Sequence, residues 1–112
     1  MKFTTKESKG ITIIELSGNV LGGPDASTLN SQLRSLLESK KKKVVVDLAE
    51  VSFINSSGLG MLIGGLTTMK NGGGELKLAR ASEKIKHLLD MTKLSGVFDV
   101  HDSVPSAVDS FH

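Results

Sequence analysis

The sequence predicts a single α/β domain over residues 1–112, with a mixed sheet of about five strands packed against about four helices. Short β-branched runs alternate with segments whose apolar residues recur at i, i+3, i+4 and i+7. The first two β-branched runs are only three residues apart, which indicates a hairpin. The later runs are separated by connections long enough for parallel crossovers. A chain of 112 residues can build one core of ordinary size but not two.

The N-terminal third should hold the hairpin and the first helix. Residues 3–7 and 11–16 are rich in β-branched side chains and are expected to pair as strands. Pro24 and Asp25 suit a helix start, where a missing N–H and a negative charge are favoured. The buried stripe of this helix comprises Ala26, Leu29, Leu33, Leu36 and Leu37, and the helix is expected to end in the lysines of residues 40–43.

The middle of the chain should supply the central strand and the second helix. Residues 44–48 are almost continuously apolar, as expected when helices cover both faces of a sheet. Residues 51–54 continue to a serine-containing turn, and a helix is expected over residues 57–70 before the glycines of residues 72–74 end it. Its buried stripe comprises Leu59, Leu62, Ile63, Leu66 and Met69.

The remaining elements are shorter. Residues 75–80 alternate polar and apolar side chains, so they predict a strand. Ser82 should cap a short helix that carries Ile85, Leu88 and Leu89. Residues 97–100 predict a last strand, and a terminal helix should contain Ala107, Val108 and Phe111.

Composition excludes several classes of protein. The chain has no cysteine, which removes disulfides and thiolate chemistry, and no apolar run approaches the ~20 residues that a membrane span needs. No signal peptide is visible at the start, so we expect a cytoplasmic protein without membrane association. The net charge is only +2, and the lysine run lacks interleaved aromatic residues. We therefore expect no nucleic-acid partner.

The turn at Asn55, Ser56 and Ser57 is the most informative stretch. Both serines should lie in the first turn of the second helix, where unpaired backbone N–H groups and the helix dipole favour a negative group such as phosphate. A simpler alternative is that Asn55 or Ser56 only caps the helix. The sequence leaves both interpretations open.

The outer face of the same helix has unusually little charge. Ser57, Met61, Gly64 and Thr68 should share a face away from the leucine stripe, with Gly60 beside them. No charged residue occurs between positions 50 and 70, and glycine is costly inside a helix. We interpret this face as a docking surface that a partner backbone approaches closely, although burial by the domain itself remains an alternative.

Motifs of common enzymes are absent. The sequence has no phosphate-binding Gly-x4-Gly-Lys-Ser/Thr loop, no dinucleotide fingerprint and no Gly-x-Ser-x-Gly elbow. The spacing of its three histidines fits no metal site, so we expect neither metal nor cofactor. Asp47 lies at the end of the central strand, where it could serve a ligand or simply bond turn amides.

The segment from Asp47 to Gly60, above all Asn55-Ser56-Ser57-Gly58-Leu59-Gly60, resembles the signature of the STAS family of anti-sigma factor antagonists. Similarity extends to Gly18, to residues 72–76 and to residues 85–94. The resemblance implies a STAS-like mixed sheet and a non-enzymatic role. Two positions differ from the family pattern, because Asn55 and Leu21 replace acidic residues.

The resemblance also implies a switch. In such antagonists the first serine of the turn, here Ser56, is phosphorylated by an anti-sigma factor that is a serine kinase, and a serine phosphatase reverses the step. The unmodified antagonist binds that kinase and frees the sigma factor. The partner-binding residues expected here are Asn55, Ser56, Ser57, Gly58, Gly60, Met61, Gly64 and Thr68. Alternatives are an unphosphorylated STAS subunit of a transporter or lipid-trafficking complex, and a small serine-dependent or nucleotide-binding enzyme.

Overall fold

A computed structural model describes residues 1–111, and these residues form one five-stranded sheet. The strands follow chain order across the sheet: β1 (Lys2–Ser8), β2 (Ile11–Val20), β3 (Lys43–Ile54), β4 (Glu75–Ala79) and β5 (Val100–His101). β1 and β2 are antiparallel, whereas every later pair is parallel. The predicted hairpin followed by parallel crossovers is therefore confirmed.

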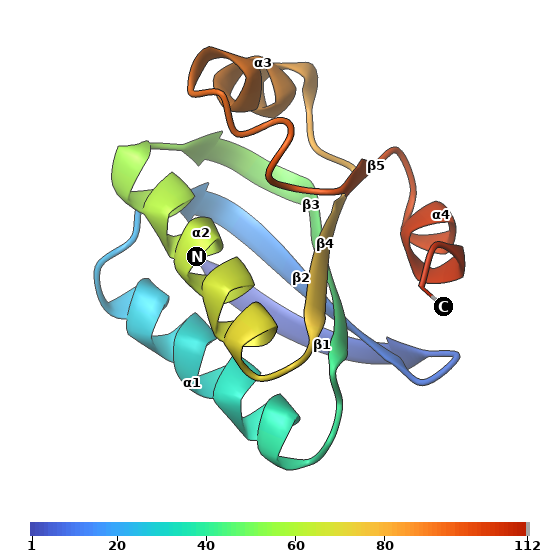
Figure 1. Cartoon of the computed structure of the whole chain (residues 1–112). Coiled ribbons are helices and arrows are strands. Elements are labelled where there is room, and N and C mark those ends of the chain that lie inside the picture. Colours follow the sequence, from blue (N-terminus) through green and yellow to red (C-terminus); the bar gives the residue numbers. More distant parts are fainter. Residues whose placement is uncertain (112) are drawn as a thin grey trace.

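Four helices cover the sheet unequally in the described part of the chain. They are α1 (Pro24–Glu38), α2 (Ser56–Asn71), α3 (Glu83–Met91) and α4 (Val104–Asp109). α1 and α2 pack side by side on one face, α4 lies on the opposite face, and α3 sits across the end of the sheet near the end of β3 (Figure 1). None of the helices in residues 1–111 combines the length and hydropathy that crossing a bilayer requires.

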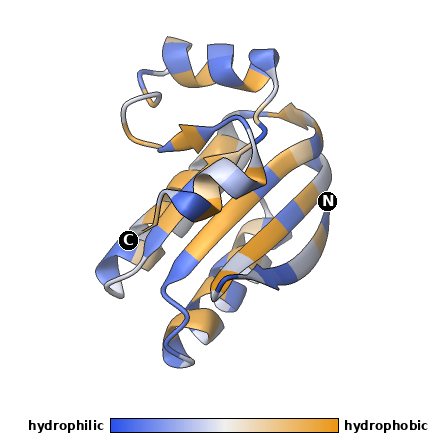
Figure 2. Cartoon of the chain, turned by 90° about the vertical axis from the view of Figure 1, so that its right-hand side faces the viewer, coloured by the Kyte–Doolittle hydropathy of each residue, from blue (hydrophilic) through white to orange (hydrophobic). Residues whose placement is uncertain are grey.

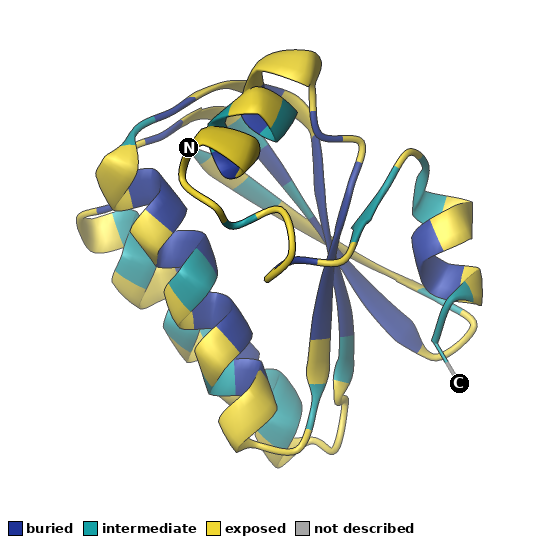
Figure 3. Ribbon diagram, turned by 45° about the horizontal axis from the view of Figure 1, so that its top comes forward, coloured by how far each residue is buried: buried dark blue, intermediate teal, exposed yellow. Residues whose placement is uncertain are grey.

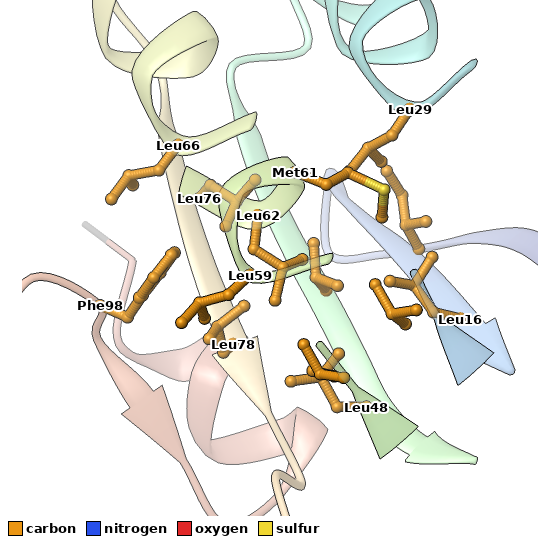
Figure 4. Close-up of a cluster of buried hydrophobic side chains, with 14 of the residues drawn as sticks. Leu16, Leu29, Leu48, Leu59, Met61, Leu62, Leu66, Leu76, Leu78 and Phe98 are labelled. Carbon is orange, nitrogen blue, oxygen red and sulfur yellow. The ribbon is translucent and has the colours of Figure 1, made fainter. Parts of the chain in front are cut away.

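Two apolar clusters hold these layers together. The larger cluster fills the space between the sheet and α1, α2 and α3, and the view in Figure 4 shows its leucines and Phe98. The smaller one lies beneath α4 and includes Val45, Ala107 and Val108. In β3, Val44 and Val46 point into the larger cluster while Val45 points into the smaller one, so this strand is apolar on both faces. Figure 2 shows the resulting apolar bands along the strands under α4.

Three strand predictions were wrong in their limits. β2 runs from Ile11 to Val20 instead of ending at residue 16. β3 is one continuous strand rather than two segments, because irregularities in its pairing with β2, between Glu15 and Ser17 and between Gly18 and Asn19, accommodate the change of register. The last strand is only Val100–His101 instead of residues 97–100. Phe98 leaves the sheet to fill the larger cluster, where it is 4% exposed. An apolar run indicates that its side chains are buried, but it does not show how. Here Phe98 is buried by packing into the larger cluster and not by pairing within a strand.

Candidate functional site

The turn between β3 and α2 presents two serine hydroxyls to solvent. α2 begins at Ser56, and Asn55 is its N-cap, with Oδ1 accepting a hydrogen bond of 2.7 Å from the Gly58 amide. Ser56 therefore has no capping role, and both Ser56 and Ser57 are exposed. The first amide of α2 with an acceptor four residues earlier is that of Leu59, which donates to the Asn55 carbonyl, so the Ser56 and Ser57 amides keep the partial positive charge of a helix start. An accessible hydroxyl thus lies where a negative group would be stabilised.

Gly58 fixes this turn against the neighbouring strand. A Cβ at Gly58 would lie 1.9 Å from the carbonyl oxygen of Val20, the last residue of β2. The same carbonyl accepts a hydrogen bond of 3.3 Å from the Asn55 amide. Gly58 is buried, and its contact with a partner stays a prediction. Only glycine allows the helix start to approach β2 this closely.

An open groove runs between α1 and α2 from the serine turn. Its volume is about 580 Å³, and one wall consists of five predicted partner-binding residues: Ser57, Gly60, Met61, Gly64 and Thr68. A Cβ at Gly60 or Gly64 would meet nothing within 4 Å, so these glycines border open space. Among the described residues, no charged side chain lines the groove. The structure thus brings these five residues together on one uncharged surface.

Met61 lines this groove but is almost completely buried instead of lying on an outer face. It is 5% exposed and belongs to the larger apolar cluster, and Figure 4 shows its side chain among the buried leucines. The prediction of an exposed Met61 was wrong because α1 packs on the same sheet face and covers that flank of α2. Gly65 has the same explanation, since its Cβ would lie 3.1 Å from Leu33 of α1. The close approach at Gly65 comes from the domain itself.

Sequence reasoning missed the second wall of the groove and the loop beside the serines. Ala26, Ser27 and Asn30 of α1 form that wall, and Thr68 Oγ1 donates a 2.5 Å hydrogen bond to Asn30 Oδ1 across it. Gly22 has a φ of +82°, and its Cβ would lie 2.9 Å from the Ser57 Cβ. The glycine pair before Pro24 was the available signal for this contact. The loop before α1 therefore packs directly on the serine turn.

Two large apolar side chains that precede the serine turn in the sequence are exposed. Leu21 is 46% exposed just after β2, and Phe53 is 53% exposed near the end of β3. Asn19, two residues before Leu21, pairs with Phe53, so both exposed side chains belong to the same end of the sheet. Figure 3 views this end from above and shows exposed residues on the helices around it. Exposed apolar area of this kind is typical of surfaces that bind other molecules.

The described residues place no general base at the serines. Neither Ser56 nor Ser57 hydrogen-bonds to a histidine or a carboxylate within residues 1–111, and no group of three potential metal ligands occurs there. Asp47 is 2% exposed, accepts a 3.1 Å hydrogen bond from the Ala49 amide and forms an ion pair with Arg80. The hydrogen bond to Asp47 raises the pKa of the Arg80 guanidinium. Asp47 therefore has a structural role that joins β3 to the residue after β4.

Comparison with known proteins agrees with this architecture. Residues 2–107 match the STAS domain family. The anti-sigma-B factor antagonist of Bacillus subtilis (strain 168) is 33% identical over 89 residues, which cover 77% of this chain and 81% of that protein. An anti-sigma factor antagonist from Mycobacterium paratuberculosis has a similar structure, with a TM-score of 0.80 and 17% identity, covering 97% of this chain and 92% of that one. The Bacillus cell fate determinant SpoIIAA in its phosphorylated form gives a TM-score of 0.72 and 16% identity, covering 96% and 97% of the two chains. The chain therefore belongs to the STAS domain family, as its serine turn predicted.

Proposed function

We propose that this chain is an anti-sigma factor antagonist that is switched by phosphorylation of Ser56. The unmodified form binds an anti-sigma factor serine kinase and so releases the sigma factor. Phosphorylation by that kinase, with ATP that the kinase supplies, ends the binding, and a serine phosphatase restores it. The observation that carries the proposal is the exposed hydroxyl of Ser56, which no cap requires and which adjoins the uncharged groove.

Phosphorylation suits Ser56 because the folded chain can accept the added charge. A phosphate brings about −1.5 to −2 charges at neutral pH. At the first residue of α2 it would face backbone amides that have no intrahelical acceptor. No acidic residue occurs in α2, and the first-turn cap is the neutral Asn55. The modification should therefore leave the fold intact.

Loss of binding follows from the surroundings of Ser56 in a complex. A partner seated on the groove would cover Gly60 and Gly64, where no side chain holds it away. Closing that interface over a phosphate would strip water from a dianion, which costs several kcal/mol unless new cations pair with it. A loss of about 2.7 kcal/mol is already a hundredfold weaker complex. We therefore expect phosphorylation to weaken binding at least about a hundredfold.

Variants of the two serines test the proposal with the anti-sigma factor kinase from the same organism. Incubation with kinase and ATP should place one phosphate on wild type and on Ser57→Ala, and none on Ser56→Ala. Ser56→Ala should bind the kinase whether or not ATP is present, whereas Ser56→Asp should bind at least about tenfold more weakly with an unchanged melting temperature. Wild-type affinity in Ser56→Asp, or phosphate on Ser57 alone, would refute the switch.

The same experiment separates the alternatives. A STAS subunit of a transporter or lipid-trafficking complex would gain no phosphate from the kinase. A serine-dependent enzyme would need a base beside Ser56 or Ser57, and the hydrogen bonds of the described residues supply none. We accordingly propose a non-enzymatic, cytoplasmic protein that acts beside the transcription machinery and contacts neither nucleic acid nor membrane. Three residues of the groove, Gly60, Gly64 and Thr68, belong to this proposal as partner-binding residues, together with Asn55 and Ser57.

A further inference from the structure

A second groove lies between the end of β3 and α3, apart from the α1–α2 groove. Its volume is about 320 Å³, and its apolar lining includes Phe53 and Ile54 on one side and Leu88 and Met91 on the other. Phe53 is 53% exposed and Met91 is 68% exposed, the two largest exposures of big apolar side chains within residues 1–111. The exposed apolar surface of Phe53 and Met91 beside this groove is available to a ligand. Methionine in particular adapts readily to irregular apolar shapes.

The ionisable side chains that line this groove are basic. Its ionisable lining residues are Lys84 and His87, and no carboxylate among residues 1–111 lines it. Lys84 has no ion-pair partner in the described part of the chain. Its neighbour Lys86, by contrast, lies 2.9 Å from a carboxylate oxygen of Asp102. An unpaired ammonium above an apolar lining is complementary to a molecule with an anionic head and an apolar body.

We propose that the β3–α3 groove binds a medium-chain fatty acid, with the acyl chain against Phe53 and Met91 and the carboxylate at Lys84. The volume is at the small end of the range of about 300–1,000 Å³ that ligand pockets span, so it suits a short or medium chain rather than a complete lipid. The site does not depend on the proposed switch. The groove is nevertheless close to the switch in the sequence, because Phe53 and Ile54, which line it, are the last residues of β3 before the turn to Ser56.

Titration of the isotope-labelled full chain with decanoate, below the concentration at which decanoate aggregates, tests the proposal by amide chemical shifts. Saturable shifts should concentrate at the end of β3 and along α3. Each methylene removed from the ligand should weaken binding about fourfold, so octanoate should bind about fifteenfold more weakly than decanoate. Decanol, which has the same chain without the charge, should bind more weakly than decanoate.

Variants separate the two parts of the interaction. Lys84→Glu should weaken decanoate at least fivefold and leave decanol unchanged, while Met91→Gln and Phe53→Ser should weaken both ligands. Val97→Ser is the matched control, because Val97 is 44% exposed but does not line the groove, and it should bind both ligands as wild type does. All four positions are exposed, so the amide spectrum should confirm that each variant is folded. Absence of saturable shifts at the groove, equal affinities for decanoate and decanol, or wild-type affinity in both Lys84→Glu and Met91→Gln would overturn the proposal.

Discussion

Replacing Gly58 by alanine tests the claim that this glycine joins the start of α2 to β2. The added Cβ would lie 1.9 Å from the Val20 carbonyl oxygen and 2.6 Å from its carbonyl carbon, both of which are backbone atoms that cannot rotate away. The helix start must then move by about 1 Å, which costs about 1–3 kcal/mol as overpacking. The movement also disturbs the Asn55 cap on the Gly58 amide, worth about 1 kcal/mol. We expect Gly58→Ala to lose about 2 to 4 kcal/mol of unfolding free energy, a large part of the stability of a small domain.

Gly60→Ala is the matched control in the same helix. A Cβ at Gly60 would meet nothing within 4 Å, and alanine is about 0.5–1 kcal/mol better than glycine inside a helix. Gly60→Ala should therefore be slightly more stable than wild type. Urea unfolding followed by far-ultraviolet circular dichroism should separate the two variants by about 2 M in midpoint, since the slope for a domain of this size is about 1–3 kcal/mol per molar urea.

The comparison can fail in two informative ways. If Gly58→Ala unfolds within 1 kcal/mol of wild type with the same slope, the close approach to Val20 does not exist in solution. If Gly60→Ala is destabilised as much as Gly58→Ala, the open space beside Gly60 is occupied by the chain itself, and the groove loses its basis. Kinase affinity then adds a second readout, because a more stable Gly60→Ala that binds weakly would locate the partner on this face.

Three further predictions follow from buried or paired side chains. Met61→Ala should lose about 2–5 kcal/mol in urea unfolding, as a core position does, rather than the change within about 0.5 kcal/mol expected at a surface position. Arg80→Ala should cost about 2 kcal/mol in the same assay, because Asp47 stays buried without its cation. The hydrogen bond from Lys77 lowers the pKa of Asp99 in the folded chain. The contribution of the Asp99 carboxylate to stability is therefore complete above the pKa that Asp99 has in the unfolded chain, and it is lost as the pH falls through the lower pKa of the folded chain. Asp99→Asn should accordingly show a flatter loss of melting temperature than wild type as pH is lowered from neutral to about pH 2.

Local patterns predicted the elements well where the deciding interactions are local. Ser82 caps α3 by accepting a 3.2 Å hydrogen bond from the Ile85 amide, as the spacing of a serine before an apolar stripe indicated. The leucines of α2 are buried as their helical spacing predicted, and the apolar run of β3 is buried as its continuity predicted. The hairpin followed from its short connection alone. In each case the information lies within a few residues.

The prediction failed where a distant segment decides burial. Met61 lies on the flank of α2 that only the position of α1 can cover, and helical periodicity does not specify on which side a neighbouring helix packs. Gly58 is buried for a similar reason, because its neighbour Val20 is remote in sequence. The place of Ala26 and Asn30 in the groove was missed because they line it from a different helix. The site is a tertiary feature, so the sequence located its serines but not its second wall.

The charge-free stretch between Glu50 and Lys70 gives the proposed switch a signature that simple destabilisation cannot produce. A phosphate on Ser56 would be the first charge in this stretch, and at a helix N-terminus a negative group contributes about 0.3–1 kcal/mol of stability. In a complex the same group must lose water over an uncharged groove, which opposes binding. We therefore expect the phosphorylated chain to melt at the same temperature as the unmodified chain, or slightly higher, while its kinase affinity falls at least about a hundredfold. A phosphorylated chain that binds poorly because it has become less stable would contradict this mechanism, and thermal melts of the two purified forms beside their binding isotherms would show it.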